Sequence, residues 1–419
     1  KGLEDTGSYT QQSMGAAGVG YVNNFTGNLT YVHPTTTGVG GRMPVSISHV
    51  YNRNGNSVSG FGSGFRLNIS QRVKWMNPNS TDALEREMYE LGYHWKYTDG
   101  DGTDIYFYKS EGKWIDEMGK GLILFSDTNT NLQTITDKDG NKLVFYDGPL
   151  GEIHDTNGNI TKIEYSGDKP VKVTDPAGKV TTLTYSGGRL SKITEPTGKS
   201  ATFTYHTAAD VHQGELLTIN RTDGGVTQLQ YGWAIKAMLR SVRDSISQYA
   251  VKYERLSARF YRISEIKEYA NTTYSSETVN TPDANLGQRI TVSYGKNETV
   301  YRTPGKDAVY GTSDDLLSIY QFDNKGKTLS VNTTSTDRKT QYGAGSYTYT
   351  KDNAKTETNT PTLAQAYQVN KVMDSASMGK NVSNLLVNHS FEQNTQTEAV
   401  GWWLSNGGTP AQNIDYRID

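Results

Sequence analysis

The sequence contains no cysteine at all. This absence excludes disulfide scaffolds, thiol nucleophiles and cysteine-ligated zinc, and it fits either an oxidising or a reducing compartment. Long apolar runs are absent too, because no segment approaches the roughly 18 consecutive apolar residues that a membrane-spanning helix needs. A strong charge of one sign is also missing: the net charge is -2, with basic and acidic residues interspersed. Neither nucleic acid nor an anionic membrane surface is therefore an expected partner.

Hydrophobic residues are scarce, at 34%, which argues against helices packed around a large aliphatic core. The chain instead has 28 tyrosines and 43 glycines, together with many threonines, asparagines and serines. Aromatic and β-branched residues favour strands, while glycine and asparagine favour the turns between them. We therefore predict an all-β fold built from many short antiparallel strands.

A repeat dominates the region between residues 130 and 235. An acidic residue is followed three positions later by glycine in four turns: Asp137 and Gly140, Asp155 and Gly158, Asp175 and Gly178, and Glu195 and Gly198. After each turn comes a strand that ends in a tyrosine, at Tyr146, Tyr165, Tyr185 and Tyr205. Successive tyrosines are 19, 20 and 20 residues apart, and such a near-constant period predicts one structural unit per repeat.

Each unit has a simple physical interpretation as a β-hairpin. The acidic side chain at the first turn position accepts backbone N–H groups, and the glycine supplies a left-handed residue. The strand after the turn alternates, as in Val180–Tyr185, with apolar side chains on one face and threonines on the other. A single hairpin is marginally stable in water, so neighbouring hairpins must pair edge to edge. The sequence therefore predicts stacked antiparallel hairpins that form a curved, shell-like sheet.

These units resemble the YD repeats of RHS and wall-associated proteins, a family that includes the shells of insecticidal toxin complexes and the barrel of teneurins. The N-terminal third is similar to the segment that precedes the repeats in secreted members, through Gly18–Tyr31, Arg42–Tyr51, Gly60–Asn68 and Tyr97–Phe107. The resemblance implies a β-strip that spirals into a shell, in a secreted or cell-wall-associated bacterial protein. In the family such a shell often encloses a C-terminal toxin cargo. The aspartate-based self-cleavage signature of the family is missing from this sequence, so neither autoproteolysis nor toxicity is transferred to any residue here.

We predict four regions along the chain. Residues 1–128 form an N-terminal β region ahead of the repeats, and residues 129–335 form the YD-repeat sheet. Residues 336–383 form a linker with one short helix. Residues 384–419 resemble the opening of a carbohydrate-binding jelly-roll module, through the segment Asn384–Phe391, and we expect this module to be truncated.

A catalytic constellation is not recognisable in the sequence. None of the seven histidines shares the spacing of a helical metal pair or adjoins a nucleophile motif, although His206 and His212 could meet across a loop. Glycosidases need two acids that face each other across a cleft. Here an acid that recurs in every unit is explained by the turn instead. We therefore predict that the chain is not an enzyme.

Two acidic loops could hold calcium, which favours several oxygen ligands close together in sequence. One loop contains Asp99, Asp101 and Asp104, and the other contains Asp307, Asp314 and Asp315. Neither has the glutamate that completes an EF-hand, and a plain Asp-Gly hairpin turn explains the first loop as well. The prediction is that no cofactor is bound, with calcium as the alternative.

Two hypotheses for function follow. The first is a structural β-scaffold, part of a shell or cell-surface strip, whose partners are the remainder of the same polypeptide and a C-terminal toxin cargo. The second is a glycan-binding, lectin-like module, because Trp402 and Trp403 could stack on the sugar rings of a cell-wall glycan. A scaffold needs only periodic turns and strand faces, whereas a lectin needs clustered exposed aromatic residues.

Overall fold

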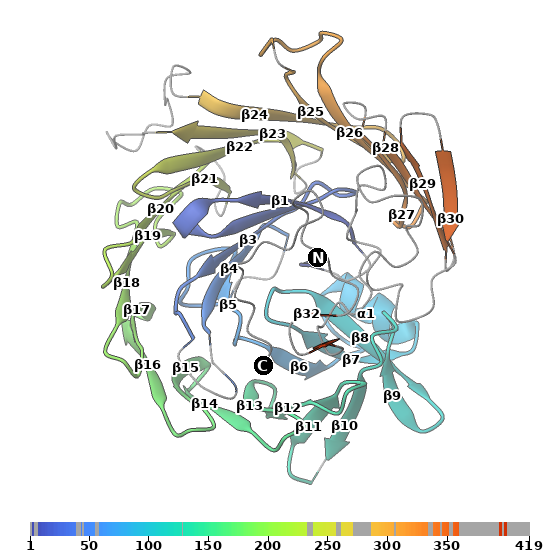
Figure 1. Cartoon of the computed structure of the whole chain (residues 1–419). Coiled ribbons are helices and arrows are strands. Elements are labelled where there is room, and N and C mark those ends of the chain that lie inside the picture. Colours follow the sequence, from blue (N-terminus) through green and yellow to red (C-terminus); the bar gives the residue numbers. More distant parts are fainter. Residues whose placement is uncertain are drawn as a thin grey trace. The chain divides into compact units, whose positions relative to one another are not determined.

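The structure is a computed structural model, and it is almost entirely β-structure (Figure 1). It describes residues 2–3, 7–38, 43, 46–54, 58–127, 129–232, 238–256, 261–270, 286–305 and 307–333, and the backbone of residues 338–343, 346–351, 355–359, 394–395 and 398–399. The chain forms two compact units, Lys1–Asp315 with Phe322–Lys327, and Leu316–Gln321 with Thr328–Asp419. Among the described residues, no helix is both long enough and apolar enough to cross a membrane.

The first unit begins with a five-stranded antiparallel sheet, which we call the inner sheet. Its strands pair in chain order: β1 (Tyr9–Ser13), β2 (Val19–Asn23), β3 (Leu29–Pro34), β4 (Ser48–Asn52) and β5 (Phe65–Leu67). A short 3-10 helix, Gly15–Ala17, connects the first two strands. Gly27, with a φ of 68°, permits the tight turn between the second and third strands.

The rest of the first unit is one long antiparallel sheet, which we call the strip. From β6 to β25, each strand pairs with the next strand of the chain. The strands are β6 (Arg72–Trp75), β7 (Tyr93–Thr98), β8 (Asp104–Ser110), β9 (Lys113–Asp116), β10 (Ile123–Asp127), β11 (Leu132–Thr136), β12 (Lys142–Tyr146), β13 (Leu150–His154), β14 (Ile160–Ser166), β15 (Lys169–Thr174), β16 (Val180–Ser186), β17 (Arg189–Thr194), β18 (Ser200–Tyr205), β19 (Leu216–Arg221), β20 (Val226–Tyr231), β21 (Leu239–Arg243), β22 (Ser247–Arg255), β23 (Tyr261–Ala270), β24 (Leu286–Tyr294) and β25 (Glu298–Thr303). One helix, α1 (Ala83–Glu90), lies in the connection between β6 and β7. The predicted all-β sheet of stacked antiparallel hairpins is confirmed.

The strip begins earlier in the chain than the sequence predicted. Strands β6 to β10 fall within residues 1–128, which were assigned to a separate region ahead of the repeats, yet they pair in the same order as the repeats do. They were predicted as β-structure but not as part of the repeat sheet, because they carry cross-strand aromatic pairs, such as Trp95 with Phe107, and lack the regular acid–glycine period. The division in this part of the chain lies between β5 and β6.

The repeat turns are held by their own aspartates. Oδ1 of Asp137, Asp155 and Asp175 each accepts hydrogen bonds from the backbone N–H groups two and four residues later, at 2.8 to 2.9 Å. The turn glycines adopt left-handed φ values of 91° at Gly140, 81° at Gly158, 78° at Gly178 and 83° at Gly198. Glu195 differs, because its longer side chain accepts hydrogen bonds from the backbone N–H and the hydroxyl of Thr37, at 3.2 and 2.9 Å. That turn is therefore tied to the segment that follows β3.

The repeat tyrosines sit at β-bulges and bridge strands where the backbone ladder ends. The register shifts by one residue immediately before Tyr165, Tyr185 and Tyr205. Backbone pairing between β15 and β16 stops at Lys172. Beyond that point the Tyr185 hydroxyl donates to the Pro170 carbonyl at 2.9 Å. The same bond recurs one unit later, from Tyr205 to the Leu190 carbonyl at 2.8 Å. Each of these two hydroxyls therefore satisfies a carbonyl that its strand no longer pairs.

Tyr146 was assigned to this series incorrectly. The bulge in β12 lies between Val144 and Phe145, and Phe145 pairs with Leu150 as Tyr165 pairs with Pro170. Phe145 is fully buried, whereas Tyr146 is 48% exposed. From turn glycine to bulge residue, β12 is two residues shorter than β14, β16 and β18. Choosing the nearest tyrosine therefore gave a position that was wrong by one residue. The aromatic period in the structure is 20 residues throughout.

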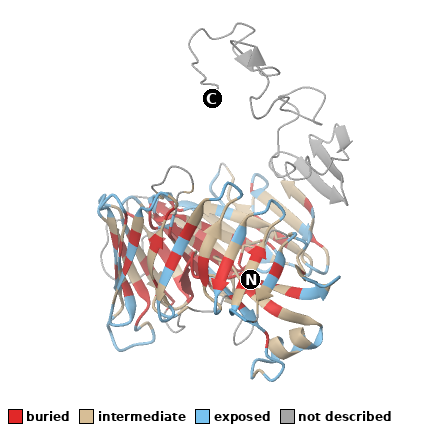
Figure 2. Cartoon of the chain, turned by 90° about the horizontal axis from the view of Figure 1, so that it is seen from below, coloured by how far each residue is buried: buried red, intermediate tan, exposed pale blue. Residues whose placement is uncertain are grey.

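The apolar core of the first unit lies between the inner sheet and the strip, which curves around it (Figure 1). Buried and exposed residues alternate along the strip strands (Figure 2), with Leu183, Ile193 and Phe203 on the buried face. Polar bonds join the two layers as well. His33 Nε2 lies 3.1 Å from the Thr227 hydroxyl, and the Leu239 N–H donates to the Tyr51 hydroxyl at 3.1 Å. The inner sheet is thus fixed to strands far along the sequence.

The second unit includes β26 (Leu316–Phe322) in its greater part, and β27 (Thr328–Thr333), β28 (Arg338–Gly343), β29 (Ser346–Lys351) and β30 (Lys355–Asn359). Strands β27 to β30 pair antiparallel in chain order, and β31 (Asn394–Thr395) pairs with β32 (Glu398–Ala399). Three of these strands lie within residues 336–383, so residues 338–343, 346–351 and 355–359 are strands and not the predicted linker. The alternation of tyrosine and threonine at 347–350 was the strand signal that was passed over.

Candidate functional site

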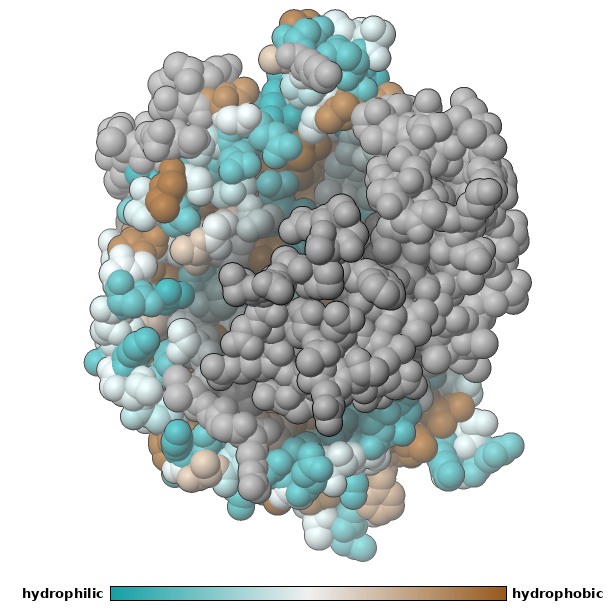
Figure 3. Space-filling view, in the orientation of Figure 1, coloured by the Kyte–Doolittle hydropathy of each residue, from teal (hydrophilic) through white to brown (hydrophobic). Residues whose placement is uncertain are grey.

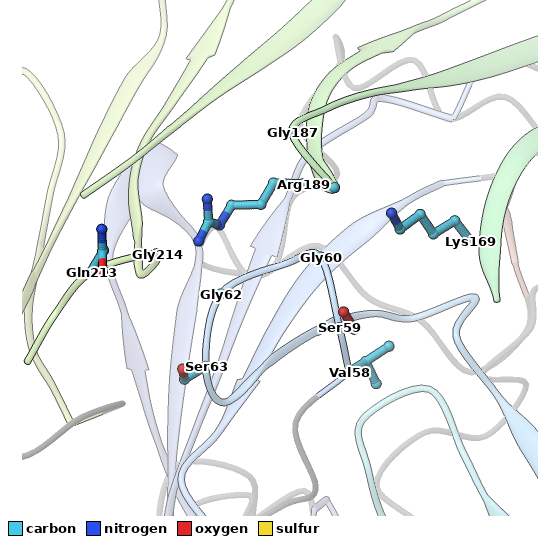
Figure 4. A pocket seen from close by; sticks show the side chains of 11 residues that line it. Val58, Ser59, Gly60, Gly62, Ser63, Lys169, Gly187, Arg189, Gln213 and Gly214 are labelled. Atoms are coloured by element: carbon cyan, nitrogen blue, oxygen red, sulfur yellow. The ribbon is translucent and has the colours of Figure 1, made fainter. Parts of the chain in front are cut away.

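A surface cavity of about 550 Å³ opens where a loop of the inner sheet meets three turns of the strip (Figure 4). The loop lies between β4 and β5, and the turns lie between β14 and β15, between β16 and β17, and ahead of β19. The lining residues are Val58, Ser59, Gly60, Gly62, Ser63, Lys169, Gly187, Gly188, Arg189, Gln213 and Gly214. All of them belong to the first unit.

Two glycines allow the inner-sheet loop to approach the strip closely. Gly60 and Gly62 have φ values of 99° and 90°, which other residues rarely adopt. A Cβ atom on Gly62 would come within 2.9 Å of the Leu216 nitrogen. The Gly60 carbonyl in turn accepts a hydrogen bond from the Leu190 N–H at 2.9 Å. This backbone contact attaches one wall of the cavity to β17.

A buried glutamate anchors the other end of the same loop. Glu215 is fully buried, and its Oε2 accepts a hydrogen bond from the Ser63 N–H at 2.9 Å. The loop is therefore held by β17 at Gly60 and by the residue before β19 at Ser63. Its shape depends on two segments of the strip that are more than twenty residues apart in the sequence.

Two cations project at the cavity from equivalent positions of adjacent repeats. Lys169 and Arg189 each begin the strand that follows a bulge tyrosine, and they pair with Ser166 and Ser186 respectively. Lys169 Nζ lies 5.5 Å from the centre of the Tyr185 ring, and the Arg189 guanidinium carbon lies 5.7 Å from the centre of the Tyr205 ring. These cation–π contacts position both side chains while leaving their N–H groups available.

The positive charge of the cavity is not neutralised by a carboxylate of the described residues. Neither Lys169 nor Arg189 takes part in the ion pairs found in that part of the chain. The nearest acid in the sequence, Asp168, pairs with Arg72 at 3.2 Å instead. The cavity therefore offers two cationic groups together with serine hydroxyls, a glutamine amide and exposed glycine backbone.

The tyrosines beneath the cations are structural and not reactive. Burial raises the pKa of Tyr185 and of Tyr205 above the usual value for tyrosine, so both phenols stay protonated at neutral pH. Each hydroxyl is also engaged as a donor to a backbone carbonyl. These phenols therefore do not supply a general base to the cavity.

The aspartates of the first predicted calcium loop are only partly brought together. Asp99 Oδ1 accepts the backbone N–H groups of Asp101 and Thr103, and burial followed by repulsion from Asp101 raises the pKa of Asp99 to about 8. Asp104 accepts the Thr98 hydroxyl at 2.6 Å, and its carboxylate lies 3.7 Å from the Lys96 ammonium. The second loop behaves similarly: Asp314 accepts the Asp307 N–H at 3.2 Å, while Asp315 pairs with Arg302.

Metal-binding geometry is not found elsewhere in the described residues either, since no group of three or more histidine, aspartate or glutamate side chains could hold an ion there. His206 and His212 do come together across a loop, as the sequence allowed, with ring centres 6.1 Å apart. Both rings pack against Tyr231, at 6.0 Å. Trp402 and Trp403, predicted to contact glycan, lie outside the described residues.

An exposed aromatic cluster lies at the start of the strip. Trp75 of β6 is 45% exposed and packs with Tyr89, Trp95 and Trp114 at ring-centre distances of 5.1 to 6.4 Å. The most exposed hydrophobic side chains, Ile246, Leu91 and Phe125, come instead from three different parts of the strip. On the face seen in Figure 3, hydrophobic residues of the coloured part are scattered among hydrophilic ones, as is normal on a protein surface.

The cavity itself was missed by sequence reasoning, although a signal was present. Two bulge tyrosines begin similar segments, Tyr-Ser-Gly-Asp-Lys at 165–169 and Tyr-Ser-Gly-Gly-Arg at 185–189. A cation that recurs at the same place in consecutive repeats points to a shared surface. The glycine loop that completes the cavity comes from a part of the chain more than a hundred residues away, which no local pattern reveals.

Comparison with solved structures gives matches of low identity. Crystal structures of TcdB2-TccC3, TcdB2-TccC3-Cdc42 and TcdB2-TccC3-TEV match with 11 to 12% identity and TM-scores of 0.25 to 0.26. The alignments cover 81 to 83% of this chain and 21 to 22% of the matched chains, so the chain spans about a fifth of their length. No protein in a search of curated sequences matches.

The family comparison agrees with the architecture. The family model described as RHS Repeat matches residues 154–200, which contain β14 to β17 together with their aspartate and glutamate turns. Two bulge tyrosines, Tyr165 and Tyr185, and the cationic residues of the cavity fall inside the match. Residues 154–200 are therefore similar to RHS repeats.

Proposed function

We propose that the chain is a structural scaffold, a β-strip that forms part of the wall of a larger exported polypeptide. The observation that carries the proposal is the unbroken pairing of successive strands from β6 to β25, with turns and bulges built by the same side-chain bonds in unit after unit. Such repetition supports a structural role for the whole sheet. An active site instead needs a set of catalytic side chains that occurs only once in the chain.

The inner sheet strengthens the proposal. A strip alone would present its apolar face to water, and here that face is covered by β1 to β5, which are fixed to it by buried polar bonds. The partners of the scaffold are then the remaining parts of the same polypeptide, and its place is outside the cell or at the cell wall.

Limited proteolysis of the full chain tests the scaffold. We expect a broad-specificity protease to leave the strip from β6 to β25 resistant as one fragment that retains the inner sheet, identified by mass spectrometry. Cleavage within the β13 to β18 hairpins at the rate of an unfolded chain would contradict a rigid wall. Assays for glycoside and peptide hydrolysis form the second arm, and turnover abolished by a single substitution in the first unit would replace the scaffold by an enzyme.

A further inference from the structure

We infer that a second cavity, formed by early turns of the strip, binds an apolar amine, a small molecule with an aromatic or aliphatic body and one ammonium group. The carboxylate of Asp99 holds the ammonium, and apolar strand residues hold the body. The inference does not rest on the scaffold role, because it concerns one site that a scaffold does not require. It also differs from calcium binding, which needs several oxygen ligands around one ion.

The second cavity has a volume of about 260 Å³ and lies where three turns of the strip meet. Asp99 lies in the turn between β7 and β8, Lys120 in the turn between β9 and β10, and Asp137 in the turn between β11 and β12. All three turns belong to the first unit. The volume is just below the ~300–1,000 Å³ of typical small-molecule sites, so it leaves room for one ring or a short aliphatic chain.

The floor of the second cavity is apolar. Tyr97 pairs with Ile105, and Leu143 pairs with Ile135 on one side and with Ile153 on the other. Paired residues share a face of the sheet, and all five line the cavity. Leu143 and Ile153 are half-buried. An apolar body on this floor covers their exposed parts and removes hydrophobic surface from water, which a small hydrated ion cannot do.

One carboxyl group of the second cavity lacks a cationic partner. Asp99 Oδ1 accepts the backbone N–H groups of Asp101 and Thr103, at 3.1 and 2.9 Å, which fixes the side chain. No ion pair of the described residues includes Asp99. Arg66 of β5 donates to the Asp99 backbone carbonyl at 3.0 Å. Lys120 lines the cavity and does not pair with Asp99 either.

The acidic groups around Asp99 make the second cavity selective for a cation. Asp137 also lines it, and its two carboxylate oxygens accept N–H groups of Asn141 at 2.9 and 2.8 Å. Burial, followed by repulsion from Asp101, raises the pKa of Asp99 to about 8. An ammonium beside the carboxylate counteracts both effects. Its binding therefore releases a proton from Asp99 and weakens as the pH falls below about 8.

Ligand-observed NMR titration of the full chain near pH 8 tests the inference, with phenethylamine and isoamylamine as probes. Three compounds separate the contributions. Phenethyl alcohol keeps the body without the charge, hydrocinnamate reverses the charge, and methylamine keeps the charge without the body. We expect saturable binding of at least one probe, about tenfold weaker binding of phenethyl alcohol, and no measurable binding of the other two compounds.

Asp99→Asn removes the charge and keeps an oxygen for the two backbone donors. It should weaken binding of the amine by about tenfold, as expected for the loss of a charge-assisted hydrogen bond. Binding of phenethyl alcohol should stay unchanged, which also shows that the fold and the floor are kept. Asp139→Asn is the matched control, because it removes the same charge from an exposed residue of the neighbouring turn that does not line the cavity.

Three outcomes would overturn the inference. Absence of saturable binding by both amines would remove the site. Equal affinities for phenethylamine and phenethyl alcohol would leave an apolar pocket without a role for Asp99. An equal loss of amine binding in Asp139→Asn and Asp99→Asn would show that only the general charge of the surface matters.

Discussion

The strip and the inner sheet are built by different rules, although both are antiparallel sheets of one unit. In the strip, each aspartate turn is held by bonds that span two to four residues, and the Tyr185 and Tyr205 hydroxyls bond carbonyls fifteen residues away. In the inner sheet the polar groups find partners much further off: His33 bonds Thr227, and Asn24 bonds Tyr301. Local repetition thus specifies the strip, whereas the inner sheet is specified by the surface that it covers.

The largest effect should come from breaking the contact between the two sheets. Tyr51 is fully buried, packs with its ring centre 5.2 Å from that of Phe65, and accepts the Leu239 N–H. Tyr51→Ala should lower the free energy of unfolding by about 3–5 kcal/mol, as for other buried aromatic truncations. Urea denaturation followed by tyrosine and tryptophan fluorescence measures the change.

Tyr146→Ala provides the matched control on the strip. Because Tyr146 is 48% exposed and lies outside the bulge series, its truncation should cost below about 1 kcal/mol. Equal stability losses in the two variants would show that the contact between the inner sheet and the strip is not especially important. They would also contradict the assignment of Phe145, and not Tyr146, to the bulge series.

Acid should weaken the inner sheet before it weakens the repeat turns. Burial lowers the pKa of both His33 and His49 to about 3, below the unfolded value of about 6.5. A histidine whose folded pKa is depressed contributes stability above its unfolded pKa, and this contribution is lost as the pH falls below that value. Between pH 7 and pH 5 the loss should be about 2 kcal/mol for each histidine.

Two buried carboxyl groups make the folded state more stable as the pH falls, which opposes the effect of the histidines. A variant is therefore needed to isolate the histidine contribution. Burial raises the pKa of Asp99 to about 8 and that of Glu117 to about 7, and both carboxyls therefore favour the folded state as the pH falls. His49→Leu should reduce the acid-dependent loss by about 2 kcal/mol relative to the wild-type protein. Identical pH dependence in the two proteins, measured by urea denaturation, would rule out the histidine contribution.

The tyrosine series offers a smaller and sharper comparison within the strip. Tyr185→Phe removes the hydroxyl that donates to the Pro170 carbonyl at 2.9 Å, and it should cost about 1 kcal/mol. Tyr165 occupies the equivalent bulge, but its buried hydroxyl has no hydrogen-bond partner among the described residues. Tyr165→Phe should therefore be neutral or stabilising, since a buried polar group without a partner is unfavourable.

Chemical denaturation of the two variants decides whether the hydrogen bond of the Tyr185 hydroxyl stabilises the bulge. Equal losses would contradict the role of the Tyr185 hydrogen bond, because the Tyr165 hydroxyl makes no such bond. A loss confined to Tyr185→Phe would show that the hydroxyl connects neighbouring strands where the ladder has ended.

The sequence predicted the features that depend on nearby residues. The alternation in Val180–Tyr185 and the acid–glycine turns indicated the strand type, the antiparallel order and the stacking, because a turn aspartate and its N–H partners lie within four residues. The same reasoning misplaced the first repeat aromatic, since Tyr146 is adjacent to the true bulge residue Phe145. A shift of one residue exchanges the two faces of a strand, and only the pairing register reveals it.

Local sequence patterns could not predict the features that depend on contacts between distant segments. Glu195 fills the position of a turn aspartate, yet its carboxylate bonds Thr37, which lies 158 residues earlier. The cavity shares this property, since Gly60 and Gly62 must meet turns of the strip before any site exists. Periodicity predicts how a hairpin pairs with the next one, but it carries no information on which surface covers the apolar face.

The smallest expected effect concerns calcium at the acidic loops. Asp314 already accepts the Asp307 N–H and the Thr312 hydroxyl, and Asp315 is paired with Arg302, so both carboxylates are engaged by the protein itself. Titration of calcium into the wild-type chain should give no saturable heat and no shift in the melting temperature, and Asp314→Ala should behave identically. A saturable heat that disappears in Asp314→Ala would identify a calcium site there. The turn at Asp314 would then be held by a calcium ion, whereas the repeat turns are held by hydrogen bonds from backbone amides to aspartate.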